Sequence, residues 1–422
     1  MSLHEAANGL LGTHVTWQDV EEEMQNALGT TAKFEENKKA INIGDMKGFM
    51  SKIALVEPNW VGGSLEDNLP EKFTVKISSQ LPFMEMSKLI DFNGNDILSD
   101  ERIKMLGAMT RMLHNKEVAV YQILMREQHP KIPITKIYAL KPFDDENTLK
   151  AFIISEFIPD VHCIGLHGSI PAEDLVPVVQ AAAAFSAIGE KLSKEETKFA
   201  CGSGVGGIVF EQFLDECAAV KMEWMIRGMF GEEHKEKVGR MLEINREYYC
   251  TERMLPRFAT TSEFFGYRPV LTHSDLWSSN FLCTRDGEKV NLKAIIDFQT
   301  VAFTTPAQDI GRLFVTSLST EDRREKADFL MEEYYKAFVE ELDRAPVPYT
   351  LQQLKDSYQV LFPLLALMVL PGIAPLLQHN DLPEEHKAIM KKSAMNKMVG
   401  LLEDFLTTHE SSMQRFPEYF DV

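Results

Sequence analysis

The fold of this chain is indicated most clearly by one stretch, Val270-Leu271-Thr272-His273-Ser274-Asp275-Leu276-Trp277-Ser278-Ser279-Asn280. A short apolar segment leads into polar residues with the spacing H-x-D-x-x-x-x-N, formed by His273, Asp275 and Asn280. His, Asp and Asn are also common turn residues, and this spacing arises by chance in roughly a few chains in a hundred. Taken alone, the stretch also fits a polar turn between two strands. The residues around it must distinguish a turn from a functional loop.

The residues that follow predict a β-hairpin. Phe281–Cys283 and Leu292–Ile296 flank Asp286-Gly287, a dipeptide typical of tight hairpin turns. Pairing of the two segments would bring Asn280 close to Asp297, which directly follows the apolar strand. A lone aspartate after a strand is usually a turn former. Placed beside the H-x-D-x-x-x-x-N spacing, Asp297 is instead predicted to bind a metal ion.

This combination is typical of phosphotransferases with the kinase fold, and each residue then has an expected role. Asp275 would accept the proton of an attacking hydroxyl, and His273 would brace the loop. Asn280 and Asp297 would hold Mg²⁺, because amide and carboxylate oxygens are the ligands that a hard cation with bound phosphates prefers.

Lys76 and Glu117 are a candidate ion pair for nucleotide binding. Phe73–Ile77 alternates with period two, so Lys76 points away from the apolar residues of its strand. A helix expected from Asn115 to about Arg126 carries Glu117, and an ion pair would fix the lysine stem to hold the α- and β-phosphates. The alternatives are a solvated lysine and a glutamate that merely favours a helix N-terminus.

Glycines between two apolar segments predict a phosphate-covering hairpin. Gly44 and Gly48 would allow the backbone to approach the phosphates closely, although Gly44–Gly48 matches G-x-G-x-x-G poorly. A formal G-x-G-x-x-G occurs at Gly202–Gly207, but no apolar strand precedes it. We therefore do not interpret it as a dinucleotide-binding fingerprint.

Secondary-structure patterns divide the chain into two parts. A helix is expected from Thr16 to Gly29, and strands at Ile134–Leu140 and Lys150–Ile158, while helices dominate after Pro171. The fold class is therefore predicted as α+β, with a protein-kinase-like arrangement of two lobes. Residues 1–158 would form a β-rich, nucleotide-binding N-lobe, and residues 159–422 a mainly helical C-lobe with the catalytic loop and the acceptor site.

The overall composition limits the kinds of molecule that the protein is expected to bind and the compartment in which it is expected to work. The formal charge of −19 over 422 residues and the pI near 5.1 disfavour nucleic-acid binding. Five widely spaced cysteines without a C-x-x-C pair suggest reduced thiols and a cytoplasmic protein. The uncharged run Val360–Leu377 contains three prolines and predicts a buried, broken helix rather than a membrane span.

The same residues resemble the choline kinase-like (CHK kinase-like) family, in particular its ecdysteroid kinase-like relatives, a group near the aminoglycoside phosphotransferases. The matching phrases run in the expected order from about residue 43 to 315: Gly48–Lys52, Phe73–Ile77, His114–Val118, His273–Asn280, Ile295–Gln299 and Asp309–Leu313.

The resemblance implies a protein-kinase-like fold, ATP and Mg²⁺ as cofactors, and a small hydroxyl-bearing acceptor. It also implies that adenine meets the backbone carbonyl of Glu156 and the N–H of Ile158, and that Asp309 braces the catalytic loop. Asp309 has an equal alternative in the first turn of a helix capped by Thr305. Ser274 departs from the wider pattern, because it replaces a glycine that is frequent there.

Three functions remain open. The leading one is an ATP-dependent kinase for a small-molecule alcohol, and the second is a degenerate kinase-fold protein that binds a ligand without transfer. A protein kinase is disfavoured because only eleven residues separate Asp297 from Asp309 and no A-P-E sequence follows. The identity of the acceptor and the oligomeric state are not indicated.

Overall fold

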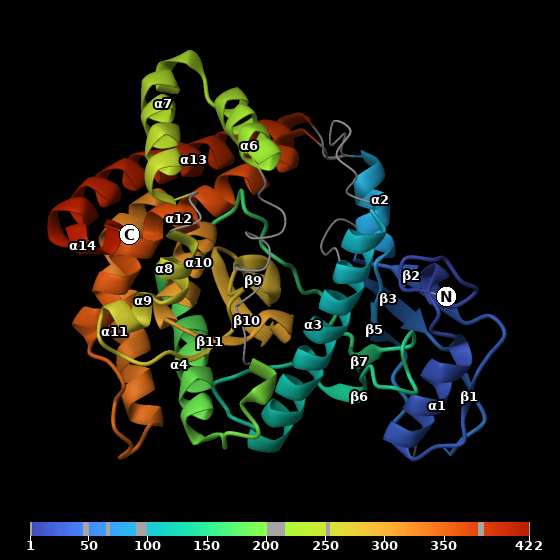
Figure 1. Ribbon diagram of the computed structural model, residues 1–422. Coiled ribbons are helices and arrows are strands. Elements are labelled where there is room, and N and C mark those ends of the chain that lie inside the picture. The colour runs from blue at the N-terminus through green and yellow to red at the C-terminus, as the bar shows by residue number, and fades with distance from the viewer. Residues whose placement is uncertain are drawn as a thin grey trace. The chain divides into compact units, whose positions relative to one another are not determined.

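The protein divides into two compact units, Met1–Gln128 with Ile134–Asp160, and His129–Pro133 with Val161–Val422. The computed structural model (Figure 1) describes residues 2–44, 50–64, 68–89, 99–200, 216–249, 254–378 and 384–421. The first unit carries most of the sheet structure and the second is mainly helical.

The first unit is built around a five-stranded sheet with the strand order β2-β3-β5-β7-β6, in which every neighbouring pair is antiparallel. Its strands are β2 (Lys39–Asn42), β3 (Ser51–Glu57), β5 (Phe73–Ser78), β6 (Ile137–Lys141) and β7 (Phe152–Glu156). The other elements are α1 (Trp17–Leu28), β1 (Lys33–Phe34), β4 (Trp60–Val61), α2 (Leu81–Leu89) and α3 (Asp100–Glu127).

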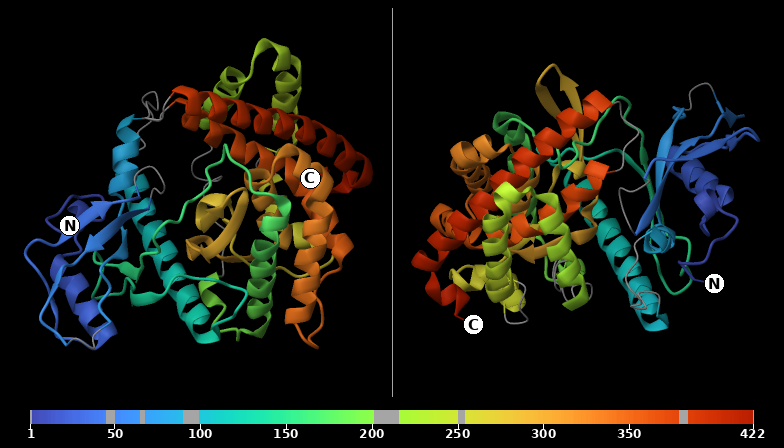
Figure 2. Two further views of the ribbon diagram at one scale, coloured as in Figure 1. Left: turned by 180° about the vertical axis from the view of Figure 1, so that it is seen from behind. Right: turned by 90° about the horizontal axis from the view of Figure 1, so that it is seen from above.

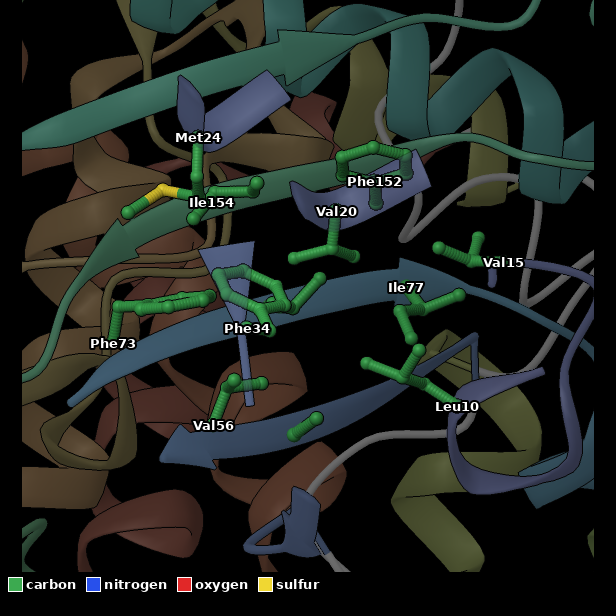
Figure 3. Packing of buried hydrophobic residues seen from close by; sticks show 12 residues of the cluster. Leu10, Val15, Val20, Met24, Phe34, Val56, Phe73, Ile77, Phe152 and Ile154 are labelled. Carbon is green, nitrogen blue, oxygen red and sulfur yellow. The ribbon is translucent and has the colours of Figure 1, made fainter. Parts of the chain in front are cut away.

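The alternating strands bury one face of this sheet. Phe73, Val75 and Ile77 of β5 are fully buried, as the period-two pattern predicts, and Val20 and Met24 of α1 pack into the same cluster (Figure 3). The cap of α1 is also the expected one. The Thr16 side chain accepts from the Asp19 N–H and the Asp19 side chain accepts in return, while Gly29 ends the helix at φ 64°.

The third helix differs from the expectation. It begins after the Ser99 cap and runs for 28 residues, so the prediction of a helix start at Asn115 is wrong. Asn115 lies in mid-helix, where its side chain exchanges two hydrogen bonds of 2.8 Å with the backbone of Phe143. A capping residue and a residue that fastens a helix to a loop use the same amide chemistry, and the sequence alone does not separate them.

The second unit packs helices around two short antiparallel ribbons. Its helices are α4 (Val176–Lys191), α6 (Glu216–Met229), α7 (Lys235–Ile244), α8 (Met254–Ala259), α9 (Thr261–Phe264), α10 (Pro306–Ser317), α11 (Thr320–Glu341), α12 (Leu351–Gln378), α13 (Glu384–Arg415) and α14 (Pro417–Phe420). The ribbons pair β8 (Val270–Thr272) with β11 (Ala302–Thr304), and β9 (Phe281–Asp286) with β10 (Lys289–Ile295). Helices α12 and α13 pack along each other (Figure 2).

The uncharged run near the C-terminus is buried over most of Val360–Leu370, as expected, but it is not broken. Helix α12 continues through Pro363 and Pro371, and Val360, Ala366 and Leu370 are fully buried. Burial of an apolar helix on several sides therefore outweighs the hydrogen bonds that its prolines remove. Within the described parts of the chain, no helix has the length and apolarity needed to cross a membrane.

The predicted fold class is confirmed. The chain is α+β, with a sheet-rich first part and a helical second part. The first part shows a kinase-like feature, a lysine on a central strand that is paired with a glutamate on the following long helix.

Candidate functional site

The first group of candidate functional side chains is an ion pair between β5 and α3. Lys76 Nζ lies 2.7 Å from Glu117 Oε2, and the glutamate side chain is only 2% exposed. Lys76 alternates with the buried residues of β5 and so leaves the opposite face of the sheet. The pair that the spacing suggested is therefore formed within the first unit.

A second contact between the same two elements fixes the rotation of α3. Ser78 Oγ and His114 Nδ1 are 2.7 Å apart, and His114 Nε2 donates to the Lys141 carbonyl oxygen at 2.9 Å. Ser78 follows Lys76 by two positions on its strand, and His114 precedes Glu117 by one turn of its helix. Burial lowers the pKa of His114 to about 4, so the ring is neutral and this contact carries no charge.

The other residues proposed for nucleotide binding also lie in the first unit. Gly44 follows β2, and its N–H donates to Asn42 Oδ1 at 3.1 Å, whereas Gly48 lies outside the described residues. Glu156 ends β7, and Ile158 lies in the irregular stretch after it. The Glu156 carboxylate accepts from the Lys136 N–H at 2.6 Å, which fixes this side chain against the neighbouring segment.

The second group surrounds the loop after β8. Both oxygens of Asp309 accept backbone hydrogen bonds, from His273 N–H and Ser274 N–H, each at 2.7 Å. His273 Nδ1 accepts from the Asp275 N–H at 3.3 Å, and its Nε2 donates to the Ile296 carbonyl oxygen at 3.1 Å. Asp309 lies in the first turn of α10, capped by Thr305, so both expectations for this residue describe its position.

Ser274 has a backbone conformation that glycine adopts more easily, which makes its departure from the wider pattern notable. Its φ is 62°, in the left-handed region that glycine adopts without strain. Its hydroxyl is 2.8 Å from Thr272 Oγ1, which is also 2.9 Å from Thr304 Oγ1. The hydroxyl contact with Thr272 and the backbone hydrogen bond to Asp309 thus stabilise serine in a conformation that glycine adopts with less strain.

Asp309 is a buried carboxylate with competing influences on its charge. Burial raises its pKa from 3.8 to about 6, while the nearby His273 and the two backbone N–H donors act in the opposite direction. The carboxylate therefore remains ionised at neutral pH, and the charge strengthens both hydrogen bonds to the loop.

Asp275 and Asn280 are brought together by the loop. Asn280 Nδ2 donates to the Asp275 carbonyl oxygen at 2.9 Å and to Asp275 Oδ2 at 3.1 Å. With its nitrogen used in this way, the amide oxygen of Asn280 is the atom left for a cation. Asn280 itself is 6% exposed, at the start of the hairpin that it was expected to precede.

Asp297 is placed next to this pair by the hairpin. Ile295 pairs with Phe281 in the β9–β10 register, and the Ile296 N–H donates to the Asn280 carbonyl oxygen at 3.0 Å. The chain then turns at Asp297, whose φ is 66°. The predicted hairpin is confirmed. Asp297 directly follows Ile296, the residue whose N–H is hydrogen-bonded to the Asn280 carbonyl oxygen.

The donor set of Asn280 and Asp297 fits Mg²⁺. An amide oxygen and a carboxylate are hard oxygen ligands, and Mg²⁺ usually takes one or two protein ligands together with phosphate oxygens and water. Among the described residues, no group of three or more His, Cys, Asp or Glu side chains forms a metal site.

Sequence reasoning missed Arg312. One of its guanidinium nitrogens is 2.5 Å from Asp275 Oδ1, and its guanidinium carbon lies 5.5 Å from the centre of the Trp277 ring. One signal was available: Arg312 follows Asp309 by three positions on a helix, so the two side chains share a face. If Asp309 faces the loop, Arg312 faces it as well.

Several solved structures are similar to this chain at low identity. A choline kinase from Cryptosporidium parvum is 12% identical, with 91% of this chain and 94% of that chain covered and a TM-score of 0.45. An ethanolamine kinase from Plasmodium vivax is 14% identical, with 89% and 85% covered and a TM-score of 0.41.

Sequence comparisons identify a relative and a family. A Caenorhabditis elegans protein named "Uncharacterized kinase-like protein D1044.1" is 35% identical over 101 residues, which are 24% of this chain and 26% of that protein. The match thus spans about a quarter of the relative's length. The model of the family DUF1679, described as "Uncharacterized oxidoreductase dhs-27", matches residues 3–413. The chain therefore belongs to the DUF1679 family.

Proposed function

We propose that this protein is an ATP-dependent kinase that transfers the γ-phosphate to a hydroxyl group of a small organic acceptor. The observation that carries the proposal is the arrangement in the second unit: Asp275 hydrogen-bonded to Asn280, with Asp297 beside Asn280 and Asp309 holding the loop. This set matches the parts of a kinase catalytic loop and its metal-binding aspartate. The choline kinase-like subgroup and the division into lobes at residue 158 belong to the same proposal.

The proposed chemistry assigns one task to each side chain. Asp275 would accept the proton of the acceptor hydroxyl, a general-base contribution of about 10²–10⁴-fold. Asn280 and Asp297 would hold Mg²⁺, which when bound would neutralise charge on the phosphates. His273 and Asp309 keep the loop in shape, so the Asp275 carboxylate need not reorganise during the reaction.

The first unit would bind the nucleotide. Lys76 would contact the α- and β-phosphates, with Glu117 fixing its ammonium group, and the backbone of Glu156 and Ile158 would meet adenine. Gly44 and Gly48 would belong to the segment that covers the phosphates. A cytoplasmic setting is part of this proposal, because ATP is available there and the buried Cys283 is a free thiol.

A different activity is named in the description of the family, that of an oxidoreductase. Dinucleotide-binding folds of the common type need a parallel sheet with a glycine-rich turn after its first strand. Every strand pairing among the described residues is antiparallel, and Gly202–Gly207 lies outside them. The described strand pairings do not match the common dinucleotide-binding fold, whereas the geometry of the loop around Asp275 favours phosphate transfer.

The test compares wild-type protein with Asp275→Asn. ATP consumption is screened across choline, ethanolamine, aminoglycosides, steroid alcohols and glucosides, and binding of Mg·ATP is followed by the rise in melting temperature. We expect the variant to keep the melting shift and to lose turnover. Asp286→Asn, in the exposed hairpin turn, is the control and should behave as wild type.

Three results would count against the proposal. Wild-type turnover in Asp275→Asn would remove Asp275 from the chemistry. A melting shift with Mg·ATP, but no transfer to any acceptor by the wild-type protein, would favour a kinase-fold protein that binds nucleotide without transferring phosphate. Absence of any shift at millimolar Mg·ATP would exclude nucleotide binding itself.

A further inference from the structure

Arg312 makes a direct charged contact with the proposed base. Its guanidinium is 2.5 Å from Asp275 Oδ1, and both side chains are 21% exposed. The same guanidinium lies over the ring of Trp277, two residues after Asp275. The aspartate belongs to the loop after β8 and the arginine to α10, so the contact joins two separate elements.

The Asp275 carboxylate is held from two sides. Oδ1 contacts Arg312, and Oδ2 accepts from Asn280 Nδ2 at 3.1 Å. These two contacts define the plane of the carboxylate. A carboxylate offers about four lone-pair sites, so an incoming hydroxyl can still donate to it without displacing either contact.

Stability alone does not explain this arginine. Within the described residues, its Nε is buried and has no hydrogen-bond partner. An unpaired buried N–H is unfavourable, and an ion pair between partly exposed side chains adds little stability. An unsatisfied buried donor is unfavourable for folding, so its presence beside a candidate catalytic group indicates a role in that group's function.

The neighbouring residues fix where Arg312 points. A Cβ on the preceding residue, Gly311, would lie 2.3 Å from Leu365 Cδ1, so the absent side chain lets α10 pack tightly against α12. Asp309, one turn earlier, is anchored to the loop by its two backbone hydrogen bonds. Helix α10 therefore cannot rotate to withdraw Arg312 without also releasing Asp309.

We infer that Arg312 is a positioning residue, which holds the Asp275 carboxylate in the orientation needed to accept a proton from the acceptor hydroxyl. The inference rests on the proposed kinase function. Arg312 acts through Asp275, and its planar guanidinium, which lies over the Trp277 ring, supplies a fixed orientation that a flexible ammonium does not.

The test uses Arg312→Met, Arg312→Lys and a matched control, Arg415→Met. Arg415 has the same chemistry elsewhere in the second unit, since it lies 2.8 Å from Asp356 Oδ1 and 4.8 Å from the centre of the Phe416 ring. Misplacing a catalytic group by about 1 Å lowers rates by about 100-fold. We expect kcat of Arg312→Met to fall about 10- to 100-fold at an ATP KM within about twofold of wild type.

Two further results are expected from the same set. Arg312→Lys should recover part of the lost kcat, and added guanidinium ion at low concentration should raise kcat of Arg312→Met but not of Arg415→Met. A purely structural role would give no rescue. Wild-type kcat in Arg312→Met, or equal losses in both methionine variants, would overturn the inference.

A measurement that does not depend on turnover separates this inference from the proposed function. The stabilities of wild type, Asp275→Asn, Arg312→Met and the double variant form a cycle that reports the coupling between the two side chains. We expect the effects of the two substitutions on the free energy of unfolding to be clearly non-additive. Additive effects would overturn the inference that Arg312 positions Asp275. If coupling is present and no acceptor is phosphorylated by the wild type, it is the kinase proposal that fails.

Discussion

Replacing Asp309 with asparagine tests the charge at the centre of the second unit. Asp309 is 3% exposed, and its two oxygens accept the N–H groups of His273 and Ser274. Asparagine keeps the shape, removes the charge and turns one acceptor into a donor. The variant therefore removes the titration at this position and one of the two acceptors, and only the first of these effects depends on pH.

The magnitude follows from the raised pKa. Burial raises the pKa of Asp309 from 3.8 to about 6, a difference of about 2 units. At 1.36 kcal/mol per unit, ionisation of this group lowers the free energy of unfolding by about 3 kcal/mol. The native state holds the proton more tightly than the unfolded chain, so this loss develops as the pH rises from about 4 to about 6. Asp309→Asn has no such titration.

The assay is urea unfolding of both proteins, followed by tryptophan fluorescence, at several values between about pH 4.5 and about pH 7.5. We expect the stability of wild type relative to Asp309→Asn to decrease with rising pH across the part of the titration that this range covers. A difference that stays constant, or that increases with pH, would refute the argument that burial dominates the charge of Asp309.

Two further predictions concern other buried charges. In Glu117→Gln, Lys76 loses its charged partner. We expect the affinity for Mg·ATP, measured by titration of the melting temperature, to fall about tenfold, because charge-assisted contacts contribute about 1.5–3 kcal/mol. Unchanged affinity would contradict a role for the pair. Lys397 donates to the carbonyl oxygens of Gly168 and Thr316, and burial, followed by the nearby Arg323, lowers its pKa to about 7. The native state then binds fewer protons than the unfolded chain above about pH 7, so wild-type stability should rise toward about pH 9 more steeply than that of Lys397→Met. Parallel urea-unfolding profiles of the two proteins would exclude this.

Local chemistry made much of the site predictable. The hairpin between Asn280 and Asp297 follows from alternation and from a turn dipeptide, both of which act over a few residues. The alternation of β5 placed Lys76 on the opposite face from Val75 in the same way. These features depend on neighbours in the sequence, so a single chain is enough to predict them.

Other features depend on contacts between distant segments. Asn115 has the composition of a helix cap, but its partner is the backbone of Phe143, which no local pattern reveals. Arg312 was passed over because spacing along a helix shows which residues share a face but not what that face meets. The β11 strand was missed as well, since its three residues become a strand only by pairing with β8.

Ser274 has a consequence for how this sequence can change over evolutionary time. Glycine at this position would tolerate φ 62° whatever surrounds it, but serine is held there by a chain of hydroxyl groups through Thr272 to Thr304. Substitution of either threonine would therefore destabilise the loop unless position 274 were also changed to glycine. The three positions should vary together among descendants of this gene, although two of them lie on different strands.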